Sequence, residues 1–177
     1  MKKFELTSES IVKLGKTLYR IRALVAFGDV KEGELGGFLE KEENLSQDGN
    51  AWVSGNAWVS GNATVSGNAT VSGNATVFGN AIVSGNARVS GNARVSGNAI
   101  VSGNATVFGN ATVFGNATVS GNARVSGNAI VSGDAWVFKT SHYLVIGPMG
   151  SRNGFTTFFR TKKLFIGVAC GWFRGNV

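Results

Sequence analysis

The amino-acid sequence predicts an all-β protein in which a central parallel β-helix carries a small β-structure at each end. Three observations predict this fold class. One six-residue pattern repeats without insertion through the middle of the chain, its apolar residues alternate as they do on β-strands, and its corners carry glycine and asparagine. A six-residue period is too short for stacked pairs of helices and is typical of a parallel β-helix.

The composition of the 177 residues excludes several classes of protein. Apolar residues make up 43%, which is too high for a disordered chain. There are 26 glycines but only one proline, which excludes collagen. A single cysteine, Cys170, and a single histidine, His142, exclude a disulfide framework and metal sites that need several such ligands from one chain. We therefore expect no cofactor.

The hydropathy of the chain points away from the membrane. No apolar stretch reaches the roughly 18 residues that a membrane-spanning helix needs. The first ten residues are basic at their start but lack the apolar core of a secretory signal. We expect a cytoplasmic protein without membrane contact.

Residues 1–48 are predicted to form a β-hairpin cap followed by a lead-in coil. The predicted strands are Lys3–Leu6, Ile11–Leu14 and Thr17–Ala23. A turn at Gly15 and Lys16 joins the last two of them. In the lead-in coil, Leu39 and Leu45 are the candidate inward residues. A cap is needed because the end of any solenoid exposes unpaired strands.

Residues 49–138 consist of fifteen consecutive hexads, GNAxVS or GNAxVF, and only Asp134 breaks the asparagine position. Alanine and valine lie two residues apart in each hexad, so on a strand they point to the same side. We expect both to face inward, while the variable residue and the final serine or phenylalanine face outward. Glycine and asparagine tolerate left-handed backbone angles and therefore form the corner.

This pattern resembles the hexapeptide-repeat, left-handed parallel β-helix family, in which a small inward residue follows an aliphatic one by four places, as Ala57 follows Val53. The resemblance implies a triangular prism with three hexads in each coil, hence about five left-handed coils. Related proteins occur in bacteria and their phages, are often labelled acyltransferases, and are commonly trimers.

With three hexads in each coil, every third hexad shares a face of the prism. The first face carries Trp52, Thr70, Arg88, Thr106 and Arg124, the second Trp58, Thr76, Arg94, Thr112 and Ile130, and the third Thr64, Ile82, Ile100, Thr118 and Trp136. The third face has no charge, and such a strip typically marks a contact surface. Ile82, Ile100 and Trp136 are its candidate contacts. Two alternatives stay open: the strip receives the chain's own flanking segments, or it receives another subunit of a dimer or trimer.

Residues 139–177 are predicted to be a basic, aromatic β-meander that closes the far end of the prism, with six Lys or Arg and no acidic residue. The predicted strands are His142–Ile146, Phe155–Thr161 and Leu164–Ala169. The candidate contacts with an anionic partner are Arg152, Arg160, Lys162, Lys163 and Phe158. Basic residues among aromatic ones suit weak binding of single-stranded nucleic acid. The alternative is that the aromatic residues form a small core and the charges are solvated.

The residues favour a non-enzymatic scaffold or interaction protein over an enzyme. Acyltransferases of the resembled family use a histidine, and His142 has no acidic residue in its own module to orient it. The partner would be a protein or nucleoprotein that contacts the basic C-terminal module. Two alternatives are an active or degenerate acyltransferase, and a phage-type accessory protein that binds and blocks a host nucleoprotein complex.

Overall fold

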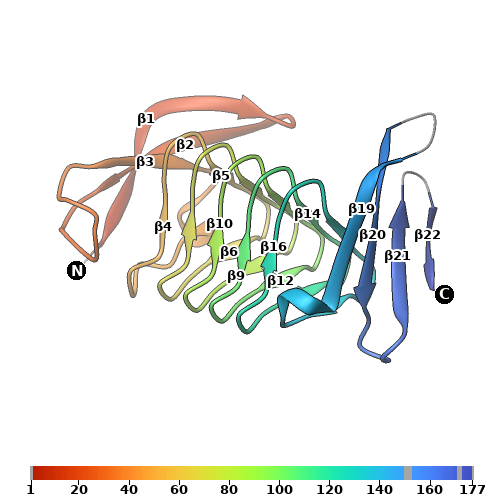
Figure 1. Ribbon diagram of the computed structural model, residues 1–177. Helices are drawn as coiled ribbons and strands as arrows, with labels where there is room; N and C mark the ends of the chain where they lie inside the picture. The colour runs from red at the N-terminus through yellow and green to blue at the C-terminus, as the bar shows by residue number, and fades with distance from the viewer. Residues whose placement is uncertain (1, 150–152, 171–172, 177) are drawn as a thin grey trace.

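The repeat forms a parallel β-solenoid of about six turns, shown by a computed structural model that describes residues 2–149, 153–170 and 173–176. A hairpin lies along the N-terminal end of the solenoid, and a four-stranded sheet stands across its C-terminal end (Figure 1). The predicted all-β solenoid with β-caps is confirmed. Within the described residues, no helix has the length and apolar character that a membrane crossing requires.

Each hexad contributes a two-residue strand made of its variable residue and its valine. The strands are β4 (Trp52–Val53), β5 (Trp58–Val59), β6 (Thr64–Val65), β7 (Thr70–Val71), β8 (Thr76–Val77), β9 (Ile82–Val83), β10 (Arg88–Val89), β11 (Arg94–Val95), β12 (Ile100–Val101), β13 (Thr106–Val107), β14 (Thr112–Val113), β15 (Thr118–Val119), β16 (Arg124–Val125), β17 (Ile130–Val131) and β18 (Trp136–Val137). Strands pair in parallel with the strand three hexads later, as Val89 with Val107. This register confirms three hexads per coil and the predicted membership of each face.

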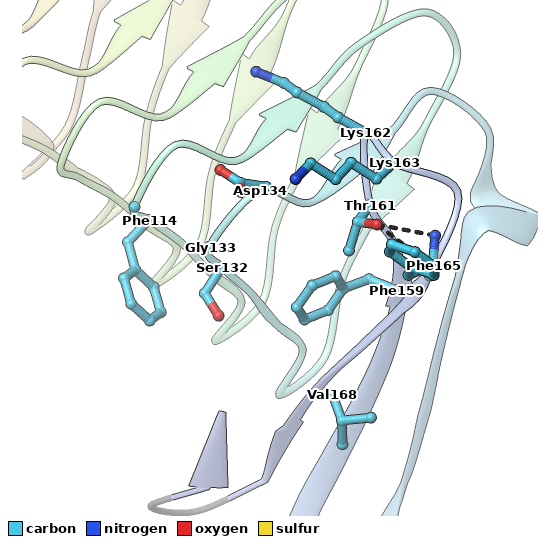
Figure 2. A pocket seen from close by; sticks show the side chains of 11 residues that line it. Phe114, Ser132, Gly133, Asp134, Phe159, Thr161, Lys162, Lys163, Phe165 and Val168 are labelled. Atoms are coloured by element: carbon cyan, nitrogen blue, oxygen red, sulfur yellow. Dashed lines mark hydrogen bonds between the residues drawn. The ribbon is translucent and has the colours of Figure 1, made fainter. Parts of the chain in front are cut away.

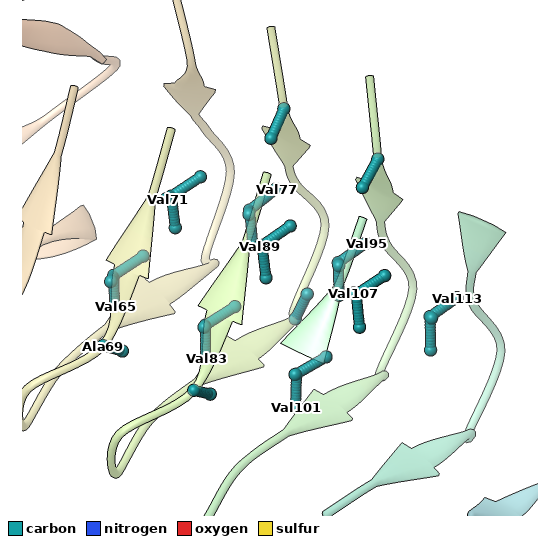
Figure 3. Close-up of a cluster of buried hydrophobic side chains, with 14 of the residues drawn as sticks. Val65, Ala69, Val71, Val77, Val83, Val89, Val95, Val101, Val107 and Val113 are labelled. Carbon is teal, nitrogen blue, oxygen red and sulfur yellow. The ribbon is translucent and has the colours of Figure 1, made fainter. Parts of the chain in front are cut away.

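The alternation of alanine and valine builds the core. Every repeat alanine and valine from Ala51 to Val137 has a relative accessibility of 0%. Figure 3 shows these valines lining the inside of successive coils. Full burial of each valine contributes roughly 1.5 kcal/mol or more, so the column of valines adds substantially to the stability of the solenoid.

The corners depend on glycine for two reasons, as Gly85 shows. Its φ of +68° is one that residues with a side chain rarely adopt. A Cβ atom there would also lie 3.0 Å from the backbone nitrogen of Gly103 in the next coil. Beside it, the Asn86 side-chain amide donates a 3.0 Å hydrogen bond to Oδ1 of Asn104. The same bond joins successive asparagines along all three corners, so the asparagines form hydrogen-bonded ladders that hold the coils together.

The N-terminal cap is an antiparallel sheet that continues the second face of the prism. It comprises β1 (Phe4–Lys13), β2 (Lys16–Ala23) and β3 (Leu35–Leu39), followed by a 3-10 turn, η1 (Glu42–Asn44). The sequence predicted two short strands where β1 is one strand with an irregularity between Leu6 and Ser10. The turn also lies one residue earlier than predicted, at Leu14 and Gly15, both with positive φ.

The lead-in coil adds a turn below the fifteen hexads. Strand β3 pairs in parallel with β5, and Leu45 forms a parallel bridge to Val65 on the third face. Leu39 and Leu45 are buried, as predicted for inward residues. The carbonyl groups at this end need donors: the Lys3 ammonium donates to the carbonyl of Ala51 at 3.0 Å, and the Asn44 amide donates to that of Ala63 at 2.8 Å.

The cap also covers two tryptophans that occupy outward positions of the repeat. Trp52 lies edge-on against Phe27, with ring centroids 5.4 Å apart. Trp58 is buried in a small cluster with Leu18 and Phe38. Both side chains therefore point away from the solenoid core but are still buried, because residues 1–48 cover the first and second faces at this end.

At the C-terminal end the last coil has backbone N–H groups without a further coil to accept their hydrogen bonds, whereas the first coil has carbonyl groups left over. After a 3-10 turn, η2 (Thr140–His142), the chain forms an antiparallel sheet. Its strands, in spatial as in chain order, are β19 (Tyr143–Met149), β20 (Gly154–Arg160), β21 (Ile166–Cys170) and β22 (Phe173–Asn176). Three hydroxyl oxygens of the C-terminal segment accept hydrogen bonds from backbone N–H groups of the last coil. The Thr140 hydroxyl accepts from Arg124, the Tyr143 hydroxyl from Ser126, and the Thr157 hydroxyl from Ile130.

Candidate functional site

The inner side of the C-terminal sheet is held against the last coil by Phe159 on β20. This ring is buried and lies over Gly167, its registered neighbour on β21. A Cβ atom at Gly167 would lie 2.2 Å from the ring, so glycine is required there. Phe158, the next residue along the strand, is only half-buried and faces the other way. Phe159 therefore serves the core of the module, while Phe158, a predicted contact, stays partly accessible.

The predicted contact Arg160 is packed against aromatic rings at the end of β20. Its guanidinium lies 5.3 Å from the ring centroid of Phe138 and 5.8 Å from that of Trp136. The sequence assigned Arg160 and Trp136 to two separate surfaces, whereas the structure brings them together. Cation–π contacts of this kind hold the arginine in place while leaving it charged.

His142 belongs to the same aromatic cluster. Its ring meets Phe138 edge-on at a centroid distance of 4.1 Å. Burial lowers the pKa of His142 below its usual value, and the charges of Arg160 and Lys139 lower it further. Its Nδ1 atom is buried without a hydrogen-bond partner among the described residues. This environment favours the neutral imidazole at pH 7.

Lys162 and Lys163, two further predicted contacts, lie in the exposed turn between β20 and β21. The backbone N–H of Lys162 donates a 3.1 Å hydrogen bond to the carbonyl of Asp134 in the last hexad. This bond and a bridge between Ala135 and Thr161 fix the turn against the last corner of the solenoid. Arg152, the remaining predicted contact, lies outside the described residues.

A cavity of about 690 Å³, here called the junction cavity, opens between this turn and the solenoid. Its lining residues include Phe114, Ser132, Asp134, Phe159, Thr161, Lys162, Lys163 and Phe165. Figure 2 shows Phe114 on one side, Phe159 and Phe165 on the other, and Asp134 near the two lysines. In the described part of the chain, ion pairs occur only within residues 1–48, so the Asp134 carboxylate and the two ammonium groups are not paired within 4.0 Å.

The outer side of the C-terminal sheet carries an apolar surface that the sequence did not single out. It comprises the exposed residues Leu144, Ile146 and Ile166 of the strands and Leu164 of the adjoining turn, whereas the exposed Phe165 borders the junction cavity. Leu164 is 65% exposed and Leu144 57% exposed, although both are large aliphatic side chains. A second cavity of about 490 Å³ lies among Leu144, Phe158 and Ile166, with Arg160 and His142 on its wall. The available signal was the unbroken apolar run from Tyr143 to Ile146, because a strand directs half of such a run to each side of its sheet.

The third face of the prism is left open by the flanking segments at Ile82, although Arg160 contacts Trp136 at its C-terminal end. Ile82 is 40% exposed, and its registered neighbour Ile100 is half-buried. The first of the two predicted alternatives, cover by the chain's own flanks, is therefore wrong for Ile82. Residues 1–48 cover Trp52 and Trp58 on the other two faces instead. Contact with another subunit stays a prediction.

Comparison with known proteins agrees with the architecture of the repeat. Seven overlapping or adjacent stretches between residues 57 and 137 match a family model described as YdcK Beta solenoid repeat. The matched stretches are residues 57–73, 69–85, 81–97, 87–103, 101–113, 105–121 and 123–137. No curated protein matches the chain.

Proposed function

We propose that this chain, whose repeat matches a β-solenoid family model over stretches between residues 57 and 137, is a non-enzymatic scaffold whose C-terminal module contacts an anionic protein or nucleoprotein partner. The module is residues 139–177. One observation carries the proposal: the exposed side of its sheet combines large aliphatic side chains with cations that have no acidic neighbour in the module. Apolar side chains favour a dry contact, and the cations favour a negatively charged partner.

The charge of the module argues against a second copy of the same surface as its partner. A symmetric contact would bring together two copies of a segment that has six Lys or Arg residues and no Asp or Glu. Like charges across an interface are unfavourable, and Arg160 lies beside the apolar residues of this surface, on the wall of the second cavity. The partner is therefore expected to carry acidic groups or phosphates.

The solenoid supplies a stiff support for this contact. Its hydrogen-bond ladders run without interruption from the N-terminal cap to the last coil. Five coils about 4.8 Å apart hold the two end structures at a separation of roughly 24 Å. A rigid spacer of this kind loses little conformational entropy when its end is bound.

Binding of labelled single-stranded oligonucleotide and of heparin, each at two salt concentrations, tests the proposal. We expect wild-type protein to bind both at low salt and to weaken as salt rises. The Lys162→Gln/Lys163→Gln variant should bind less tightly and lose about 0.7 of the salt slope for each lost phosphate contact.

The matched control is Lys13→Gln/Lys31→Gln, which removes the same charge at exposed sites of the N-terminal cap. That variant should bind as tightly as wild type if the C-terminal module is the contact. Equal weakening of both double variants would mean that net charge alone causes binding. No binding of either polyanion at low salt would overturn the proposal of an anionic partner.

Three finer features accompany the proposal. The left-handed sense of the coil is the one that the hexapeptide resemblance implies. We propose a cytoplasmic location and, through the third face with Ile82 and Ile100, a homo-oligomer. The uncharged face is then buried between solenoids while the C-terminal module remains accessible to its partner.

A further inference from the structure

The one asparagine position that the repeat changes lies in the junction cavity. Fourteen hexads carry asparagine and the fifteenth carries Asp134, which lines this cavity beside the turn with Lys162 and Lys163. The ladder does not require the change, because a side-chain oxygen is present in asparagine as in aspartate. The substitution adds a negative charge and a second acceptor oxygen at this one corner.

The walls of the junction cavity combine three kinds of chemistry. The rings of Phe114, Phe159 and Phe165 provide flat apolar surfaces on two sides. The Asp134 carboxylate accepts hydrogen bonds only, and its two oxygens can accept from two adjacent donors. The ammonium groups of Lys162 and Lys163 supply two positive charges that are not paired with the carboxylate.

A nucleotide uses all three kinds of group at once. Its base is a flat ring that stacks on aromatic side chains, and its phosphates pair with lysines. The Watson–Crick edge of the base would meet the Asp134 carboxylate. Because a carboxylate only accepts hydrogen bonds, it favours a base that has donors on that edge. Guanine presents two neighbouring N–H donors on that edge, whereas thymine presents one between two acceptors. The cavity of about 690 Å³ lies in the size range of small-molecule sites.

Resting on the function proposed above, we propose that the junction cavity holds one unstacked base of a single-stranded nucleic acid and favours guanine. Asp134 accepts the donors of the base edge, while Phe114 and Phe165 border the ring. Lys162 and Lys163 bind the neighbouring phosphates. The anionic partner of the C-terminal module is then single-stranded nucleic acid, free or within a nucleoprotein.

Fluorescence anisotropy with four labelled ten-nucleotide strands tests this inference. One strand is all dT, and the other three carry a single central dG, dA or dC, which avoids the self-association of guanine runs. Wild type should bind the dG strand about tenfold more tightly than the dT strand, the size expected for one two-point contact to a base. Asp134→Asn, which restores the residue of the repeat, should reduce that preference to less than about twofold.

Two further variants separate the parts of the site. Lys162→Gln/Lys163→Gln should weaken all four strands alike and keep the order of preference. Asn128→Asp places a carboxylate at the last asparagine of another corner, outside the junction cavity, and should leave the preference unchanged. Thermal unfolding of each variant shows whether it is folded as wild type.

The outcomes distinguish this inference from the function on which it rests. Equal binding of all four strands by wild type, or a dG preference that survives in Asp134→Asn, would overturn the base site and leave the anionic partner in place. Binding of heparin without binding of any oligonucleotide would do the same. Failure to bind any polyanion would overturn both.

Discussion

The hydroxyl of Thr157 accepts a 2.8 Å hydrogen bond from the backbone N–H of Ile130 in the last coil. Thr157 is fully buried, and it stands where the next coil of the solenoid would have supplied a carbonyl oxygen. A side chain of the C-terminal sheet thus ends the ladder of β17 without adding a strand to it.

Loss of this acceptor should destabilise the protein. Thr157→Val keeps the shape of the side chain but leaves the Ile130 N–H buried and unpaired, which costs about 1–3 kcal/mol. Thr156→Val is the matched control, because Thr156 is half-buried and its hydroxyl makes a weak 3.9 Å hydrogen bond to the sulfur of Met149. Denaturant unfolding measures both, and equal losses would contradict a capping role for Thr157.

Two corner glycines separate backbone strain from steric conflict. Gly85 and Gly127 have nearly the same φ, +68° and +66°, but a Cβ atom would approach the next coil only at Gly85. Alanine at either site should cost about 1–2 kcal/mol for the left-handed backbone. Gly85→Ala should cost about 1–3 kcal/mol more, because three backbone atoms of Gly103 obstruct it. Similar unfolding midpoints for the two variants would rule out close stacking of the corners.

Neighbouring residues on one strand should respond differently to charge. Val95→Asp places an unpaired carboxylate in the core and should cost about 4 kcal/mol or more. Ser96→Asp, one residue along, reaches solvent and should change stability by less than about 1 kcal/mol. Thermal unfolding followed by circular dichroism compares them, and the inward assignment fails if the two transitions shift equally.

The buried Lys3 predicts a stability change in the alkaline range. Burial lowers the pKa of Lys3 from 10.5 to about 8, although the charge of Asp48 opposes the shift. Between these two pH values the unfolded chain binds more protons than the folded one, so the stability of the protein rises with pH. Below about pH 8 both states carry the proton, and the contribution is constant.

The difference in melting temperature between wild type and Lys3→Met should therefore grow in favour of wild type from pH 8 to pH 10.5. Lys13→Met, at an exposed site of the same cap, provides the comparison. A difference that stays flat across this range would show that Lys3 is not desolvated.

The open third face predicts association in solution. Ile82→Lys/Ile100→Lys should convert an oligomer into a folded monomer, since it places two charges on an otherwise uncharged strip. Light scattering measures the mass, and circular dichroism checks the fold. A wild-type monomer would contradict the subunit contact, whatever the variant does.

The sequence was sufficient to predict the solenoid because each hexad repeats the same Gly-Asn corner and the same alternation of alanine and valine. Alternation placed Val53 inward, and the resemblance to the hexapeptide family placed Thr70 above Trp52 in the next coil. What covers an outward side chain depends on distant segments instead. Trp52 and Trp58 occupy the same outward position of the hexad, which the repeat alone predicts to be exposed. Residues elsewhere in the chain nevertheless bury both side chains.

The candidate site was predictable only in part for the same reason. The excess of positive charge and the opposite orientation of Phe158 and Phe159 were visible in the sequence. The contact of Arg160 with Trp136 and the position of Asp134 beside Lys162 required the turn of the C-terminal sheet to be placed against the last corner. Asp134 was nevertheless detectable as the one exception among the asparagines.

The register of three hexads per coil also means that the length of the solenoid can change in fixed steps of one coil. Adding or removing 18 residues changes the separation of the two end structures by one interstrand spacing, about 4.8 Å, and leaves their relative orientation the same. A single hexad more or less would instead turn the C-terminal sheet by a third of a revolution, away from its present alignment with the N-terminal hairpin. Variants that differ by whole coils therefore share both ends and differ only in reach.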